Sequence, residues 1–485
     1  MYGYLKRLVS AGAAYQLGSV VSSVIALALL PLYTRYLSRA DYGTAELLLT
    51  VVISVSLIVR FGLVDAFVRF YYLDDNPQRR ARVTRTATAA MLLTTTVAAV
   101  LVAVLAGPLS ELVLGYRDAT ILQITGFSIW SFTNLEAAYA LLRVDERKRA
   151  YVTASLTNVA LTVALTVYLV VVREEGARGL LLGNFGASAV VLVGLWVALR
   201  GRLGLPSPPA ELGPMLRFGL PTVPAELSVF ALNVIDRFYL YRAQSAAAAG
   251  LYALAAKLAG VIIIVVRAFQ YAYPPLAYSV TDDAEARRLY ARVMTYYVLF
   301  CGLLVAGLAL LGRWVLRVFA APSFFDAYQA LPWVALAWAL YGVFLILVVM
   351  AGRANVTSRN VVAAGAGLVV NVAGLVLLVD PLGIAGAGIS VCLAYVVMIA
   401  LMYLFTRSLF AVGFEWGRLG HAVAVIAGVT VAGELLLPDD GAAGLAGRLA
   451  VLAAIPMLLA LTGFLRPEER ARLRALLARG RPAAG

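Results

Sequence analysis

Apolar runs of about twenty residues, separated by short polar or charged stretches, follow one another along the whole chain. A helix needs about 20 apolar residues to cross a hydrocarbon core roughly 30 Å thick, and irregular backbone cannot face lipid there. The pattern predicts an all-α integral membrane protein with fourteen transmembrane helices, at residues 10–33, 44–68, 86–108, 119–142, 151–172, 179–199, 217–241, 250–274, 293–311, 328–351, 360–379, 384–406, 419–437 and 444–465.

Basic clusters between these runs set the predicted orientation. They recur after every second run, as in QRRARVTR at 78–85 and RVDERKRA at 143–150. The positive-inside rule places such clusters in the cytoplasm. With fourteen crossings, both termini then face the cytoplasm. The first residues, MYGYLKRLVSAGAAYQ, lack the features of a removable signal peptide, so we expect the N-terminus to be retained.

Composition supports this interpretation and excludes several classes of function. The chain is 62% hydrophobic and only 14% charged, with a mean hydropathy of +0.88. Its net charge of +14 lies in short clusters between apolar runs, which argues against a nucleic-acid partner. His421 is the only histidine, and Cys301 and Cys392 both fall in apolar runs. We therefore expect no metal site, no disulfide framework and no cofactor.

The chain also matches itself when it is shifted by 207 residues. The matching pairs are Gly12 with Gly219, Arg35 with Arg242, Gly43 with Gly250, Arg60 with Arg267, Tyr71 with Tyr278, Gly176 with Gly383, and Gly179 with Gly386. The arginine and tyrosine pairs are the most informative, because glycines match often by chance in a glycine-rich chain. The pattern predicts an internal duplication, as in many membrane transporters.

Six predicted helices in each copy make the copies parallel, because an even number of crossings returns the chain to its starting side. We expect two six-helix bundles around a central cavity. The predicted parts are an N-terminal lobe (1–199), a cytoplasmic linker (200–216), a C-terminal lobe (217–410), transmembrane helices 13 and 14 (411–466) and a basic cytoplasmic tail (467–485). The tail fits either an amphipathic helix on the anionic inner surface or a positively charged anchor.

Four basic residues lie inside predicted helices: Arg60, Arg69, Lys257 and Arg267. A central Lys or Arg costs about 2.5 to 3.5 kcal/mol on insertion scales. Arg69 has Asp65 four residues before it, the spacing of a helical ion pair. Asp65 is five residues from Arg60 and does not share its helix face, so Arg60 needs a partner elsewhere.

Arg60 and Arg267 are equivalent in the duplication and are predicted to lie at equal depth. Each side chain could extend to the cytoplasmic interface along its apolar stem. Alternatively, both face a water-filled cavity between the lobes, where guanidinium groups bind phosphate oxygens in a bidentate manner. Lys257 either extends this basic path outward or reaches the outer interface.

Three other residues are candidates for ion coupling or a counter-ion role. Glu226 follows two prolines in PTVPAELSVF, the kind of break at which transporters bind ions, or it is the counter-ion of Arg267. Asp236 is interpreted first as an interfacial pair with Arg237. Asn371 could take part in ion coupling, or its only role could be to hydrogen-bond a neighbouring helix. The coupling partner is left open among H⁺, Na⁺ and the membrane potential.

Three stretches resemble bacterial Wzx-type lipid-linked oligosaccharide flippases, also called the polysaccharide biosynthesis or polysaccharide transporter family. They are LPLYTRYLSRADYGTAELLLTVV at 30–52, GLYALAAKLAGV at 250–261 and NVIDRFYL at 233–240. The resemblance covers most of the chain. The family belongs to the multidrug/oligosaccharidyl-lipid/polysaccharide exporter superfamily, whose fold of two six-helix bundles agrees with the predicted duplication.

The resemblance implies a flippase rather than an enzyme. Its cargo would be an undecaprenyl-diphosphate-linked oligosaccharide, moved from the inner to the outer leaflet of the bacterial cytoplasmic membrane by alternating access. Membrane lipids are implied partners, and polysaccharide polymerases and glycosyltransferases are candidate partners. In related peptidoglycan lipid flippases, arginines of helices 2 and 8 are proposed to hold the diphosphate, and Arg60 and Arg267 lie on those helices. Helices 13 and 14 resemble a pair that can form a groove for the polyprenyl tail.

Three alternatives are less consistent with the residues. The predicted first helix lacks the cavity arginines of peptidoglycan lipid flippases, which favours a broader oligosaccharide cargo over lipid II. A multidrug exporter of the same fold would bind cations and should have an acidic cavity with few arginines. A glycan polymerase or ligase would need a large outer loop with catalytic residues, and the longest outer stretch here is short.

Overall fold

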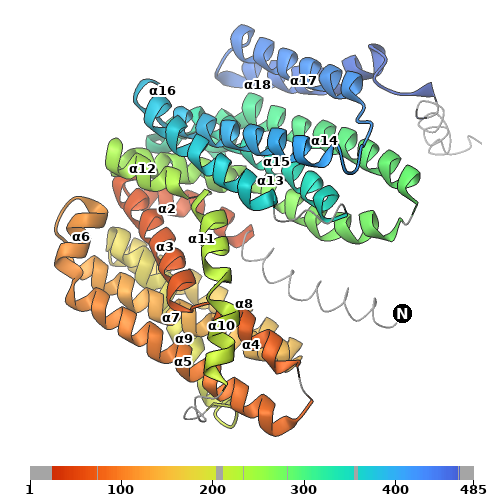
Figure 1. Cartoon of the computed structure of the whole chain (residues 1–485). Coiled ribbons are helices and arrows are strands. Elements are labelled where there is room, and N and C mark those ends of the chain that lie inside the picture. The colour runs from red at the N-terminus through yellow and green to blue at the C-terminus, as the bar shows by residue number, and fades with distance from the viewer. Residues whose placement is uncertain are drawn as a thin grey trace, which may run out of the picture. The chain divides into compact units, whose positions relative to one another are not determined.

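The computed structural model describes residues 24–73, 75–203, 211–232, 234–280, 282–353, 359–467 and 469. These residues are helical apart from turns and short loops, and no strand occurs among them. The elements in Figure 1 are α2 Leu30–Tyr36, α3 Arg39–Val59, α4 Leu63–Tyr71, α5 Pro77–Val104, α6 Ala106–Leu114, α7 Ala119–Val144, α8 Lys148–Val167, η1 Tyr168–Val172, α9 Gly176–Ala198, α10 Leu212–Gly219, α11 Thr222–Leu232, α12 Ile235–Ala243, α13 Ala246–Ser279, α14 Asp283–Phe319, η2 Pro322–Gln329, α15 Leu331–Arg353, α16 Arg359–Thr406, α17 Trp416–Leu436 and α18 Gly441–Leu461.

Ten helical segments among the described residues are long and apolar enough to cross a membrane. They are α3, α5, α8 with η1, α9, α13, α14, α15, α16, α17 and α18. The all-α membrane class predicted from the sequence is confirmed. The count of fourteen stays a prediction, because most of the first expected helix lies outside the described residues. Part of the linker, Asn233 and nearly all of the basic tail also lie outside the described residues.

Several predicted spans are broken or joined in ways that a hydropathy window does not register. The expected helix 44–68 divides into α3 and α4, because Phe61 (φ 49°) and Gly62 (φ 66°) adopt left-handed backbone. A Cβ on Gly62 would lie 2.2 Å from the Gly219 carbonyl oxygen, so the break packs backbone against backbone. The expected helices 360–379 and 384–406 form one kinked element, α16, with non-helical backbone at Gly383.

The chain divides into two compact units. Unit 1 consists of Met1–Leu254, Phe319–Asp326 and Asn371–Ala387, and unit 2 consists of Ala255–Val318, Ala327–Val370 and Gly388–Gly485. The core of unit 1 joins α4, α5, α7 and α9, with buried residues that include Phe67, Met91, Leu141 and Leu192. In unit 2, a smaller core joins the hairpin of α17 and α18 to α14. The lobe boundaries expected from the sequence stay a prediction.

Two glycine pairs of the 207-residue repeat have matching structural roles. Gly176 and Gly383 both have left-handed backbone, with φ of 56° and 58°. Gly43 and Gly250 contact each other in unit 1, and the contact is reciprocal. A Cβ on Gly43 would lie 2.8 Å from the Gly250 nitrogen, and a Cβ on Gly250 would lie 3.0 Å from the Gly43 nitrogen. Only glycine permits this approach of α3 to α13.

Gly43→Val should therefore destabilise the protein strongly. A Cβ at this position would lie 1.9 Å from the Ala246 carbonyl oxygen, which is backbone and cannot rotate away. Overpacking of this kind costs about 1–3 kcal/mol. Thermal unfolding in detergent should show a lower midpoint for Gly43→Val than for the control Gly194→Val, whose Cβ would meet nothing within 4 Å. Equal midpoints would contradict the packing described here.

Candidate functional site

Arg60, the first predicted site residue, forms an ion pair inside unit 1. It is the capping residue that follows α3, just before the Phe61–Gly62 break. Its Nη2 donates to Oε2 of Glu226 on α11 at 2.5 Å, and the two side chains are 19% and 30% exposed. The predicted need for a partner on another element is thus met. Glu226 pairs with Arg60, whereas the sequence suggested Arg267.

Other charged groups surround this ion pair. The Asp65 carboxyl, one turn beyond the break, is hydrogen-bonded to that of Glu226. Arg143 of α7 lies close enough to interact electrostatically with Asp65 and with Glu136. The sequence predicted an ion pair between Asp65 and Arg69 on one helix, but the two residues make other contacts. The Arg69 guanidinium instead lies over the Phe218 ring, 4.4 Å from its centroid.

Arg267 and Lys257 lie on α13, in unit 2. Arg267 is exposed, and its charge acts on the hydroxyl of Tyr341 on α15. Lys257 is half-buried ten residues earlier on the same helix. Arg60, in contrast, belongs to unit 1.

Asp236 has a buried environment that the sequence did not predict. It is 3% exposed, whereas an interfacial pair with Arg237 would be exposed. Oδ2 accepts a short hydrogen bond from the Tyr252 hydroxyl, and Oδ1 accepts one from the backbone N–H of Arg237 at 2.8 Å. The Arg237 side chain donates instead to Thr50 Oγ1, at 3.4 Å. Tyr252 is the partner that sequence reasoning missed, because it lies on the following helix.

Asn371 lies near Asp236 in unit 1. It is fully buried, and its Nδ2 donates to the Leu232 carbonyl at 3.4 Å, one turn before Asp236. This contact agrees with the interhelical hydrogen-bonding role that the sequence suggested. The Asn371 Oδ1 atom, however, has no hydrogen-bond partner among the described residues. The end of α11 therefore has a carbonyl bound by Asn371, whose amide oxygen makes no hydrogen bond among the described residues, and Asp236 follows one turn later.

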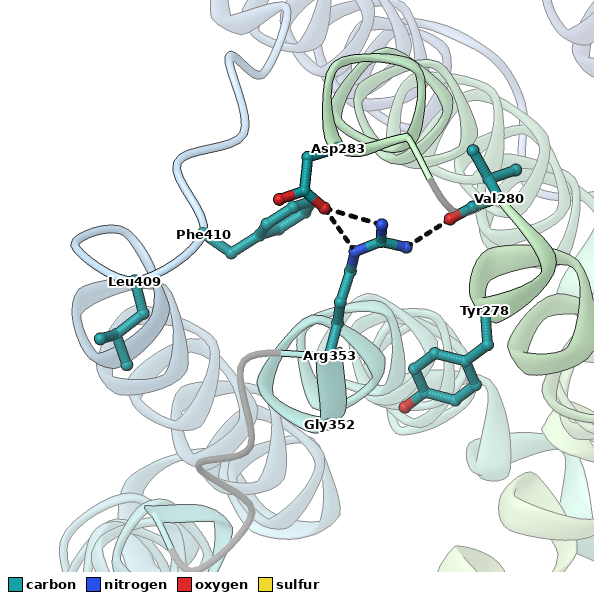
Figure 2. A pocket seen from close by; sticks show the side chains of 7 residues that line it. All are labelled: Tyr278, Val280, Asp283, Gly352, Arg353, Leu409 and Phe410. Atoms are coloured by element: carbon teal, nitrogen blue, oxygen red, sulfur yellow. Dashed lines mark hydrogen bonds and ion pairs between the residues drawn. The ribbon is translucent and has the colours of Figure 1, made fainter.

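Each predicted repeat copy has a pocket at its predicted cytoplasmic end. Tyr71 lines the pocket of the first copy, and the equivalent Tyr278 lines that of the second. In unit 2, a cavity of about 460 Å³ contains Arg353, which Figure 2 shows between Asp283 and the Val280 carbonyl. Arg353 Nη2 donates to Asp283 Oδ1 at 2.7 Å, and Nη1 donates to Val280 O at 2.8 Å. Its guanidinium also lies 5.3 Å from the centroid of Phe410.

The equivalent pocket of unit 1, about 490 Å³, is lined by both acidic and basic side chains, among them Asp145 and Arg202. Asp145 Oδ1 accepts from Arg202 Nη2 at 2.5 Å and from the Tyr71 hydroxyl at 2.8 Å. Burial raises the pKa of Tyr71, and its hydrogen bond to Asp145 raises it further. Each pocket thus contains an ion pair of arginine with aspartate, Arg353 with Asp283 in unit 2 and Arg202 with Asp145 in unit 1.

A third pocket, of about 700 Å³, lies at the end of unit 1 that the charge pattern predicts to face outward. Its lining includes Asp41, Asp118, Glu174 and Arg178. Arg178 Nη2 donates to both carboxylate oxygens of Asp118, at 3.0 and 2.9 Å. Burial alone would raise the pKa of Asp118, but the bonds from Arg178 and from a backbone N–H hold it below its usual value.

An apolar groove of about 620 Å³ runs between α14, α15 and α17 in unit 2. Its lining is almost wholly apolar, with Arg313 and Glu434 among its few charged residues. Next to it, Arg448 of α18 is fully buried, pairs with Glu434 and donates to Asp439 Oδ1 at 2.7 Å. Sequence reasoning missed this cluster, because it joins Arg448 of α18 to Glu434 of α17 and to Asp439 in the turn between these two helices.

No group of three or more His, Cys, Asp or Glu side chains suited to a metal ion occurs in the part of the chain that the structure describes.

A family model described as Polysaccharide biosynthesis protein matches residues 32–328. The chain belongs to the polysaccharide biosynthesis protein family. No curated protein matches the sequence significantly.

Solved structures of membrane transporters share the fold of this family member. The lipid II flippase MurJ in an inward closed conformation has a TM-score of 0.71 and 13% identity, covering 92% of this chain and 98% of that one. An inward-facing multidrug resistance MATE transporter of the MOP superfamily has a TM-score of 0.60 and 14% identity, covering 82% and 94%. The MATE transporter VcmN of Vibrio cholerae in its bent form has a TM-score of 0.52 and 15% identity, covering 83% and 97%. The chain thus shares its fold with these transporters.

Asp145→Ala should lower the free energy of unfolding by about 1–3 kcal/mol, because Arg202 and Tyr71 lose a charged acceptor. Glu146→Ala is the matched control, since Glu146 is the exposed neighbouring acid in the same pocket. Chemical unfolding in detergent, followed by intrinsic fluorescence, gives both values. If the two variants are equally stable, the Asp145 cluster does not hold these helix ends together.

Proposed function

We propose that the protein is a flippase for an undecaprenyl-diphosphate-linked oligosaccharide, which it moves from the inner to the outer leaflet by alternating access. Family membership and the transporter fold support this proposal. The observation that carries it is the Arg60 guanidinium, held in the interior of a predicted membrane span in a chain of this family. Its Nε is buried without a hydrogen-bond partner among the described residues, so it has donor capacity left for a ligand.

The ligand that suits this donor is an anion with several oxygens. A guanidinium has five N–H donors in a planar fork that matches phosphate geometry. In surroundings of reduced dielectric, a charge-assisted hydrogen bond is stronger than in water. Arg60 and Arg267 are proposed to bind the diphosphate, and Lys257 is proposed to extend the basic path. A drug exporter for cations would gain nothing from these arginines.

The groove between α14, α15 and α17 is proposed to hold part of the polyprenyl tail. A saturated or isoprenoid chain gains about 25 cal/mol per Å² of apolar surface that it buries. The lining is apolar over most of the groove. The likeness to a lipid II flippase supports a lipid cargo of this kind. A lipid-linked oligosaccharide is favoured over lipid II, because the predicted first helix lacks the cavity arginines of peptidoglycan lipid flippases.

Asp236 and Asn371 are proposed to form a cation-coupling site, with Glu226 as a further acidic group in the same unit. Oxygen ligands suit hard cations such as Na⁺, and helix breaks supply carbonyl oxygens for them. The unused Oδ1 of Asn371, next to the α11 end and Asp236, supports this assignment. A proton on Asp236 is the other form of coupling that this geometry suits.

The proposed setting follows from the cargo. The protein would lie in the bacterial cytoplasmic membrane with both termini in the cytoplasm. It would take its cargo from glycosyltransferases on the inner side and deliver it to a polysaccharide polymerase on the outer side. Both are proposed partners, inferred from the chemistry of the cargo.

Arg60→Ala and Arg267→Ala should each reduce surface glycan at least tenfold in a strain that depends on this protein, because one charge-assisted contact to the diphosphate is lost. Arg69→Ala is the matched control on the same predicted span, since the Arg69 guanidinium packs on Phe218. Surface glycan is measured by immunoblotting at equal membrane levels of each variant. Normal export by both Arg60→Ala and Arg267→Ala would end the diphosphate assignment.

Ala309→Trp should fill the groove and weaken binding of long-chain lipid diphosphates while leaving short ones unaffected. Ala309 lines the groove on α14. The measurement compares binding of undecaprenyl diphosphate and inorganic diphosphate to the purified protein in nanodiscs. We expect a loss of fivefold or more for the lipid alone, since about 1 kcal/mol of apolar contact disappears. An equal effect on both ligands would count against a tail groove.

A further inference from the structure

The ion pair of Arg60 with Glu226 is held at a junction built from two helix breaks. Arg60 caps the C-terminal end of α3, immediately before the left-handed residues Phe61 and Gly62. Glu226 lies in the second turn of α11, just after the interruption between α10 and α11. The two breaks touch, because a Cβ on Gly219 would lie 2.7 Å from the Gly62 carbonyl oxygen. The backbone therefore fixes how closely the two charged side chains approach.

Neither partner is fully engaged by the other. One contact, from Nη2 to Oε2, joins them, and the Arg60 Nε is buried without a partner among the described residues. Glu226 has a second neighbour in Asp65, whose carboxyl is hydrogen-bonded to it. This contact with Asp65 does not involve Arg60. Glu226 therefore retains a partner if Arg60 leaves it.

We propose that Glu226 is a resident competitor for the lipid diphosphate at Arg60. This inference rests on the proposed function, in which Arg60 binds the diphosphate. In the empty carrier, Glu226 neutralises a guanidinium that would otherwise be buried and unpaired, a costly state in a membrane. An arriving diphosphate offers more charge and more acceptor oxygens than one carboxylate, and it displaces Glu226 towards Asp65.

The same competition assists release. A site with an uncontested guanidinium would hold a diphosphate tightly on both sides of the membrane and return to the inner side slowly. When the Arg60–Glu226 pair re-forms, it offsets part of the free energy of diphosphate binding. The apparent affinity for the diphosphate falls by the fraction of time that Glu226 occupies Arg60. Glu226 thereby lowers affinity and raises turnover. The charged groups that face this exchange are Arg143, Asp65 and Glu136.

Binding of farnesyl diphosphate to the full-length protein in detergent tests this proposal. Glu226→Gln keeps the shape of the side chain and removes its charge, so we expect about tenfold tighter binding than in the native protein. Glu226→Asp, which withdraws the carboxylate by one methylene group, should bind with intermediate affinity. Glu175→Gln removes an equal charge from the same unit without touching Arg60 and should bind as the native protein does.

A second readout separates competition from a structural role. In cells, Glu226→Gln should export less glycan despite its tighter binding, because release becomes slow. A purely structural glutamate would weaken binding and export together. Equal or weaker binding of farnesyl diphosphate by folded Glu226→Gln overturns the competitor role while leaving Arg60 as the site. Native-like binding by Arg60→Ala overturns the diphosphate site itself, and the double variant Arg60→Ala, Glu226→Gln should bind no better than Arg60→Ala.

Discussion

A permanent cation inside a membrane needs an anion, and much of the chemistry of this chain depends on how that need is met at Arg60. Low dielectric makes an unpaired guanidinium costly and a paired one strong. Glu226 supplies the anion when no ligand is present, and the breaks beside Gly62 and Gly219 bring the two helices close enough for the contact. The same features leave donor capacity for a phosphate oxygen. In the proposed mechanism, the Arg60 guanidinium pairs with Glu226 in the empty carrier and with the diphosphate in the loaded one.

The two halves of the predicted duplication share backbone features. Gly43 and Gly250 pack against each other, and Gly176 and Gly383 both have a positive φ. At the predicted cytoplasmic ends, the pockets beside Tyr71 and Tyr278 each contain an ion pair of arginine with aspartate. Backbone features that only glycine satisfies, and one type of ion pair, thus occur in both halves.

Much of the fold was predictable from the sequence, because the length and polarity of the apolar runs are fixed by the thickness of the membrane. The pairings were much less predictable. Hydropathy shows that Arg60 needs a partner, but the choice of Glu226 depends on a break at Phe61 and on contact between residues 166 positions apart. The burial of Asp236 depends on Tyr252 of the next helix, and that of Arg448 on Glu434. Residue types and spacing along one helix contain no information about such contacts between helices.

The central claim is that this chain itself moves a lipid diphosphate across a bilayer. The most direct measurement uses the purified protein in liposomes with a fluorescently labelled undecaprenyl-diphosphate-linked oligosaccharide and a reductant that cannot cross the membrane. If the account is right, the inner-leaflet label becomes accessible to the reductant within minutes in liposomes that contain the native protein, and remains protected in those with Arg60→Ala. Protection of the inner-leaflet label in the presence of folded native protein would contradict it.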